Sequence, residues 1–156
     1  MEKLPAGYRV VAGISVGYAA LLGLILIPVL RAALAPVPPY VLGPYSFSNP
    51  NWPRAWLDLI GAWVLPPAGL VVLGCMLFTR SRAVQRRAVW AALGTAATLV
   101  LQAGLLLASF VSVPPDDDAV VWWVILLFST MLPLTWAVVL FATGLRLGRR
   151  LQRPAA

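Results

Sequence analysis

The sequence predicts an all-α integral membrane protein, a four-transmembrane-helix up-down bundle with both termini on the cytoplasmic side. The chain of 156 residues is 61% hydrophobic and 11% charged, whereas a soluble domain carries about 25% charged residues. Its charges leave four uninterrupted apolar stretches of 21 to 28 residues, and about 20 residues cross a bilayer as a helix. The short alternating segments of about 10 residues that are typical of membrane β-barrels are absent from the sequence.

The positions of charges and prolines divide the chain, which we expect to be a single membrane domain, residues 1–156. The segment between the first two apolar stretches carries six prolines, which block backbone donors and prevent a long helix. We expect the first span to be retained rather than cleaved as a signal peptide, because its apolar region exceeds the usual length of about 7–15 residues. In chain order we predict a first span at about 10–30, a proline-rich outer loop at 31–54, a second span at about 56–78, a basic inner loop at 79–87, a third span at about 88–113, an acidic outer loop at 114–118, a fourth span at about 119–145 and a basic cytoplasmic tail at 146–156.

The distribution of charge predicts the orientation. Ten of the twelve basic residues fall on the side of the two termini and the inner loop, and only Arg31 and Arg54 fall on the other side. Because basic residues prefer the cytoplasmic side of short loops, we expect both termini in the cytoplasm of a multi-pass inner-membrane protein. The dominance of arginine over lysine favours a bacterial source. The net charge of +7 then indicates attraction to membrane lipids rather than to nucleic acid.

The two halves of the chain align with each other. Sliding the second span onto the fourth by 67 residues gives ten identities over positions 56–86, among them Pro66 with Pro133. The first span aligns with the third at an offset of 77, which pairs Gly17 with Gly94. The sequence therefore predicts a tandem repeat of two helical hairpins, with shared apolar composition as the alternative explanation of the matches.

Three consecutive aspartates, Asp116, Asp117 and Asp118, precede the fourth span. A helix N-terminus carries unpaired N–H groups and a partial positive charge, so acidic residues there act as a helix cap. The alternative is a weak cation site, which adjacent side chains on one helix are poorly placed to form. We interpret the aspartates as a cap and predict no metal site.

Tryptophans gather at the outer ends of the second and fourth spans. Amphipathic aromatic residues anchor at membrane interfaces, which predicts a lipid-facing belt; a pocket for a lipid, a quinone-like ring or a partner helix is the alternative. The predicted outer aromatic surface consists of Trp52, Trp56, Trp63, Trp122 and Trp123.

A second group of residues lies at mid-depth in the predicted spans. Each internal proline removes a helical hydrogen bond, which frees the carbonyl of Ala62, Trp63 or Ser129 one turn earlier. Proline-broken helices at matching depth are typical of transporter substrate sites, whereas a glutamine and several hydroxyls can also simply bridge helices. The candidate ligand or packing layer consists of Tyr18, Pro66, Pro67, Gln102, Ser129, Thr130 and Pro133.

The sequence has no histidine and a single cysteine, which argues against haem and zinc ligation and against the common catalytic sets. We therefore predict a non-enzyme without a cofactor. Small residues spaced for close packing occur at Gly13 and Gly17, at Ala19 and Gly23, and at Gly104 and Ala108. The first hypothesis is that the protein is an accessory or interaction subunit of a homo- or hetero-oligomeric membrane complex. Its partners would be membrane lipids and either a second copy of the chain or another membrane protein. The alternative is a small carrier or binding protein for a neutral or lipophilic ligand at the mid-depth layer.

Overall fold

The computed structural model describes residues 4–35, 52–79, 81–111 and 119–152, and the described part of the chain is helical without a strand. Its elements are α1 (Ala6–Leu34), α2 (Trp52–Leu59), the π-helical segment η1 (Ile60–Val64), α3 (Leu65–Phe78), α4 (Arg82–Val111) and α5 (Ala119–Gln152). Four stretches are long and apolar enough to cross a membrane, with α2, η1 and α3 forming one of them. The predicted all-helical, multi-pass architecture is confirmed at this level.

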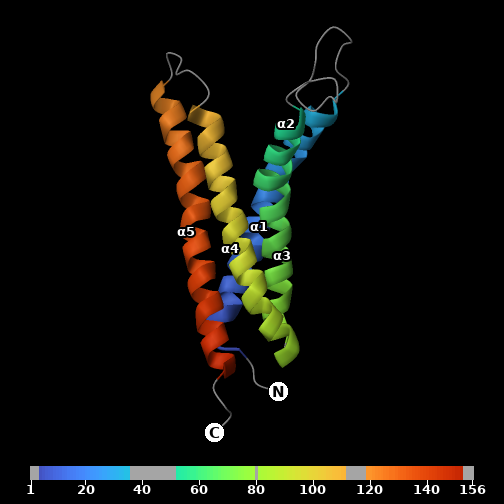
Figure 1. The fold of residues 1–156 in the computed structure, drawn as a ribbon, viewed down its shortest axis with the longest axis vertical. Helices are drawn as coiled ribbons and strands as arrows, with labels where there is room; N and C mark the ends of the chain where they lie inside the picture. The colour runs from blue at the N-terminus through green and yellow to red at the C-terminus, as the bar shows by residue number, and fades with distance from the viewer. Residues whose placement is uncertain (1–3, 36–51, 80, 112–118, 153–156) are drawn as a thin grey trace.

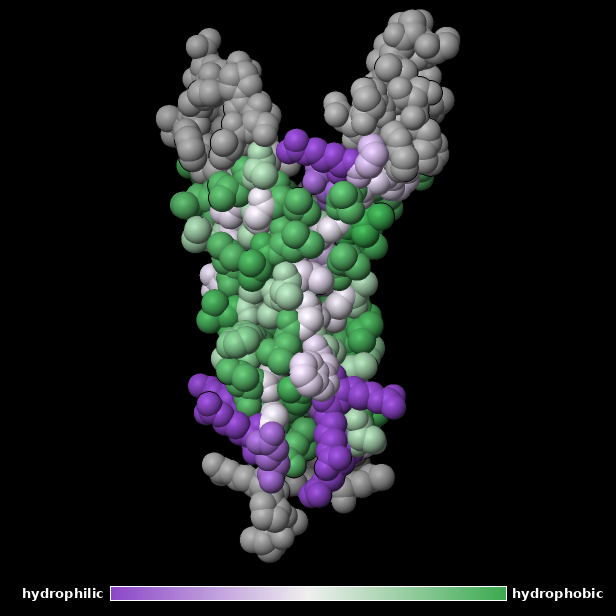
Figure 2. Space-filling model, viewed as in Figure 1, coloured by the Kyte–Doolittle hydropathy of each residue, from purple (hydrophilic) through white to green (hydrophobic). Residues whose placement is uncertain are grey.

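The four spans form two antiparallel hairpins, which diverge toward one end of the molecule (Figure 1). The span formed by α2, η1 and α3 packs against α1, and α4 packs against α5. The beginning of α1 and the end of α5 lie at the same, converging end (Figure 1). Figure 2 shows a hydrophobic belt around the middle of the visible face, with hydrophilic residues gathered above and below it, as expected for a chain that crosses a bilayer.

All four helical stretches extend beyond the membrane spans that the sequence predicts, and α4 and α5 do so farthest at a single end. The helix α4 begins at Arg82, so most of the predicted inner loop, 79–87, is helical. The helix α5 continues through Arg149 and Arg150 to Gln152, into the predicted tail, 146–156. Arginine is a good helix former, and its long side chain carries the charge out to the interface while the helix continues. The end of the charge-free stretch therefore does not mark the end of the helix.

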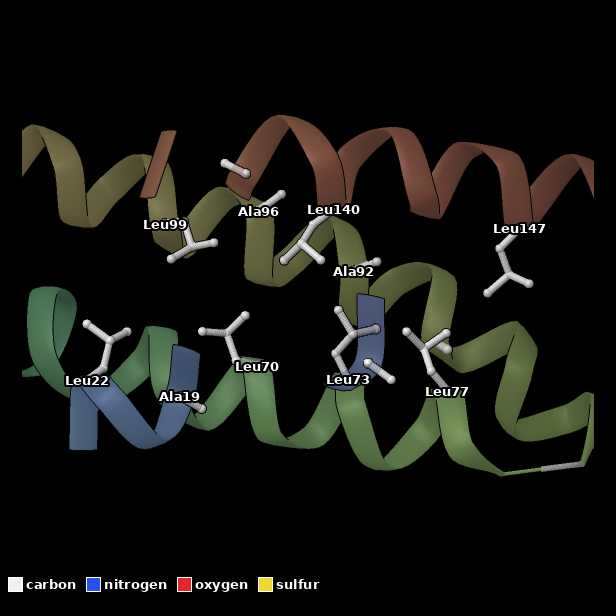
Figure 3. Packing of buried hydrophobic residues seen from close by; sticks show 13 residues of the cluster. Ala19, Leu22, Leu70, Leu73, Leu77, Ala92, Ala96, Leu99, Leu140 and Leu147 are labelled. Carbon is white, nitrogen blue, oxygen red and sulfur yellow. The ribbon is translucent and has the colours of Figure 1, made fainter. Parts of the chain in front are cut away.

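A core of leucine and alanine joins the two hairpins. Leu70, Leu73 and Leu77 of α3 point toward the side where Leu140 and Leu147 of α5 lie (Figure 3), and all five side chains are at most 2% exposed. The helix α4 runs between them and contributes small residues. Its buried core positions Ala88, Ala92, Ala96 and Leu99 recur at spacings of three and four, which places them on one face of the helix.

Glycines allow the helices to approach closely inside this bundle. A Cβ atom added at Gly69 of α3 would lie 2.7 Å from Thr95 Oγ1 of α4, and one added at Gly144 of α5 would lie 3.3 Å from Ala92 Cβ. At Gly74 of α3, the added atom would lie 2.6 Å from Val16 Cγ2 of α1. Small residues at such contacts bring helix backbones close enough for van der Waals packing, which replaces the hydrophobic effect as the driving force within a bilayer.

The chain packs in the order α1, α3, α4, α5, each helix against the next. In the described part of the chain, α1 and α5 share no extensive backbone contact. The packing order therefore leaves one edge of the bundle, between the first and the last helix, less closely packed than the other three.

Candidate functional site

Contacts between neighbouring helices show which mid-span residues lie at the same depth in the bundle. A Cβ atom added at Gly61 of η1 would meet the side chains of Leu101 and Leu105 on α4. Gln102 lies between these two leucines in the sequence, so it is placed at the depth of η1. It is 2% exposed, and its Oε1 atom has no hydrogen-bond partner.

The π-helical segment η1 stands directly before the paired prolines of the second span. The N–H of Leu65 donates to the carbonyl of Ile60, five residues earlier. The carbonyl of Ala62 would take its helical donor from position 66 in an α-helix or from position 67 in a π-helix, and both positions are prolines without an N–H group. Since Ala62 is only 3% exposed, η1 presents a buried acceptor that its own helix does not pair.

Pro133 behaves differently from the proline pair. It is fully buried, yet α5 stays α-helical across it from Ala119 to Gln152. Thr130 is also buried, and its Oγ1 donates to the carbonyl of Leu127 at 3.3 Å. This bond is an ordinary side-chain contact within the helix, because the carbonyl that loses its helical donor at Pro133 is that of Ser129 and not that of Leu127.

The helix register brings most of the predicted layer to one depth. An added Cβ at Gly144 would meet Ala92 and Leu93, and counting along the antiparallel helices from there places Gln102 at the depth of Pro133. Ser129, which is half-buried, lies one turn farther out along α5. Tyr18 is half-buried against the core, and the contact of Gly74 with Val16 places it nearer the converging end, about one turn beyond Pro66.

Two buried polar groups were missed in the sequence. The Nε1 atom of Trp136 has no hydrogen-bond partner, and neither does Oγ of the fully buried Ser15. Trp136 lies within about one turn of Gln102 in depth. Ser15 lies at the depth of Gly74, which is about 18 Å farther along the second span than Ala62 at 1.5 Å per residue. A tryptophan three residues after Pro133, far from the ends of its span, was the signal that could have identified the first of them.

The other predicted site residues fall partly outside the described part of the chain. The backbones of Trp52, Trp122 and Trp123 are helical, but their side chains are not among those described, and Asp116, Asp117 and Asp118 lie outside the described residues altogether. Trp56 and Trp63 are half-buried, so neither extends freely from the helix surface. Within the described residues, no group of three or more His, Cys, Asp or Glu side chains could hold a metal ion.

The outward faces of α1 and α4 carry glycines that pack against nothing in the described part of the chain. Gly13 and Gly17 on α1, and Gly94 and Gly104 on α4, have no atom within 4 Å of an added Cβ. On α1 these glycines stand among large exposed side chains, namely Val10, Ile14, Leu21 and Leu24. The first span is also the least covered, with 22% of its most apolar window buried against 39%, 33% and 33% in the other three.

No protein family model, curated protein or solved structure matches this chain.

Proposed function

We propose that this protein is a small, non-catalytic accessory or interaction subunit of a membrane complex, and that it docks through the outward faces of α1 and α4. The division of its glycines carries the proposal. Of the eleven glycines in the described helices, five have a neighbour within 4 Å and six have none. The first group packs the chain's own helices, which leaves the outward group without a role inside the molecule.

Glycine is an unfavourable helix residue, about 1 kcal/mol worse than alanine in water. In a membrane, glycine is useful where it lets the backbone of another helix come close. A large apolar side chain gains little by leaving the lipid, because lipid tails are as apolar as the side chain itself. A face on which Gly13 and Gly17 stand among large apolar side chains suits contact with a transmembrane helix of another chain. Both a second copy and a different membrane protein satisfy this requirement.

Substituting the outward glycines tests this proposal. Gly17→Leu and Gly104→Leu fill the open faces, so we expect at least a tenfold loss of association, which corresponds to about 1.4 kcal/mol. The readout is native mass spectrometry of the protein taken directly from its membrane into nanodiscs. The thermal midpoint of the single chain should stay within about 2 °C, because nothing lies within 4 Å of either glycine.

Val71→Leu provides the control, since Val71 is 45% exposed on α3, outside the glycine faces of α1 and α4. It should leave association unchanged. Finding the wild-type chain alone in nanodiscs, without a partner or a second copy, would refute the subunit proposal. So would an unaltered complex with both leucine variants.

We further propose that the chain resides in a bacterial inner membrane with both termini in the cytoplasm, because ten of its twelve basic residues lie on that side. A green fluorescent protein fused after residue 156 should therefore fluoresce, and alkaline phosphatase fused at the same position should be inactive. The same phosphatase inserted after residue 43 should be active. The reverse pattern at the two positions would contradict this orientation.

A tandem repeat of two hairpins is part of the same proposal. Positions related by the two offsets have similar environments: Pro66 and Pro133 are both buried, Leu73 and Leu140 are both 0% exposed, and Gly17 and Gly94 are both open. This agreement supports duplication of an ancestral hairpin. Among the open glycines of α1 and α4, Gly17 and Gly94 are the pair that the alignment relates.

A further inference from the structure

We infer that the interior of the bundle at the depth of η1 binds a neutral amphipathic molecule, whose hydroxyl head is held by Gln102 and Trp136 and whose apolar tail lies between α1 and α5. This inference does not depend on the docking proposal, since it concerns the inside of the bundle rather than the outward glycine faces.

The two side chains offer complementary hydrogen-bonding groups. The Oε1 atom of Gln102 accepts a hydrogen bond and the Nε1 atom of Trp136 donates one, and neither atom has a partner although both are buried. Buried polar atoms in folded proteins are almost always paired. A hydroxyl group donates and accepts at the same time, as a water molecule does, so one hydroxyl group has the donor and the acceptor that both residues need.

The carbonyl of Ala62 adds a second acceptor at this depth. It has no helical donor because residues 66 and 67 are both prolines, and the segment that contains it contacts α4, where Gln102 lies. A head group with two hydroxyls, such as a glycerol ester, could therefore donate to Gln102 and to Ala62 and accept from Trp136.

The absence of charge in the spans determines the class of ligand. No Lys, Arg, Asp or Glu occurs in residues 10–30, 59–79, 88–111 or 119–145. A charged head group at this depth would have no counter-charge, and buried charges without partners are strongly unfavourable in a membrane. The ligand head is therefore neutral.

The packing order supplies the route for the tail. Along the described helices, α1, α3, α4 and α5 each contact the next, whereas α1 and α5 share no extensive backbone contact. The two hairpins also diverge toward the end opposite to the beginning of α1 (Figure 1). In the inferred complex the apolar tail enters from the lipid along this edge. Trp136, which is half-buried and packs against the core, belongs to α5, one of the two helices that border the edge.

Photolabelling of the full chain in nanodiscs tests the inference. The probe is a hexadecanol with a mid-chain diazirine, and the matched probe is its methyl ether, which accepts but cannot donate a hydrogen bond. We expect saturable labelling of peptides from α1 and α5 by the alcohol, displaced by unlabelled 1-hexadecanol, and about fivefold weaker labelling by the ether, the usual effect of one hydrogen bond.

Variants assign the head-group contacts. Gln102→Leu and Trp136→Phe should each weaken saturable labelling about fivefold. Thr98→Val is the control, because the Thr98 hydroxyl already donates to the carbonyl of Thr95 at 2.9 Å, and it should label like the wild type. The thermal midpoint of each variant shows that the chain is folded.

Several results would overturn the inference. Equal labelling of the wild-type chain by alcohol and ether excludes recognition of a hydroxyl, and this comparison needs no variant. Labelling that unlabelled 1-hexadecanol does not displace indicates bulk lipid only. Displacement by glycerol as effective as by 1-hexadecanol would show a site for a soluble polyol rather than for a membrane amphipath. Unchanged labelling of both variants would show that Gln102 and Trp136 do not hold the head group.

Discussion

Replacing Gly74 by leucine is expected to separate α1 from α3 and to lower the stability of the chain by about 3 kcal/mol or more, the upper end of the range for overpacked contacts. An added Cβ at this position would lie 2.6 Å from Val16 Cγ2 and 3.4 Å from the backbone carbonyl oxygen of Ala12. Neither neighbour can move away easily, because valine has one strongly preferred rotamer in a helix and the carbonyl belongs to the backbone. Thermal unfolding in nanodiscs, followed by circular dichroism, measures the loss.

Gly13→Leu is the matched control for this experiment. Gly13 lies on the adjacent helix, α1, and has nothing within 4 Å, so the same chemical change should leave the unfolding midpoint of the single chain nearly unaltered. Similar midpoints for the two variants would show that α1 does not pack on α3 through Gly74. If only Gly13→Leu lowered the unfolding midpoint strongly, α1 would pack on the rest of the bundle through the face that carries Gly13.

The sequence and the structure agree on the number of spans because charge determines it. A run of about 20 uncharged residues is needed to cross a bilayer, and charged residues are too unfavourable there to interrupt it. The position of the helix ends could not be predicted in the same way. Arg82 and Gln152 lie within helices because arginine and glutamine are good helix formers. Their polar side chains must reach water, but this requirement does not end the helix.

The sequence did not indicate which glycines face inward. Gly13 and Gly17 have the same spacing as Gly144 and Gly148, yet the first pair is open and the second packs against Val89, Ala92 and Leu93 of α4. In a soluble helix the polar face would distinguish the two cases. In a membrane both faces are apolar, so hydrophobic periodicity carries little information about which face is buried.

The candidate layer at mid-depth was only partly predictable for a similar reason. Gln102 stands out because an amide in the middle of a span needs a partner. The tryptophans were interpreted as interfacial anchors, and this general preference concealed Trp136, which packs against the core. Whether a tryptophan N–H is paired depends on the neighbouring helices, which the local sequence does not specify.

The docking and ligand proposals both involve α1, and the experiments separate them. Gly17 lies on the outward face of α1. The ligand proposal instead concerns the inside of the bundle and its edge between α1 and α5. Gly17→Leu should therefore dissociate a complex without changing photolabelling by the hexadecanol probe. Gln102→Leu should weaken photolabelling without dissociating the complex. If each variant changed both readouts, the two sites would be coupled through movement of α1.

Truncation of the core leucines is the second change for which we expect a large loss of stability. Leu73 and Leu140 are both 0% exposed, and they lie on opposite sides of the core that joins the two hairpins. Truncating either to alanine should lower the free energy of unfolding by about 2–5 kcal/mol, the loss expected when a buried leucine leaves a cavity. Equal losses at the two positions are expected if the hairpins are repeats, because the 67-residue offset relates these leucines to each other.

Val138→Ala provides the comparison within the same helix. Val138 is 69% exposed on α5, so its truncation removes contacts with lipid rather than with the core and should change stability by less than about 0.5 kcal/mol. The measurement compares the unfolding midpoints of Leu73→Ala, Leu140→Ala and Val138→Ala in one lipid composition. If Leu140→Ala were as mild as Val138→Ala, α5 would not be held through this face, and the two hairpins would associate through α3 and α4 alone.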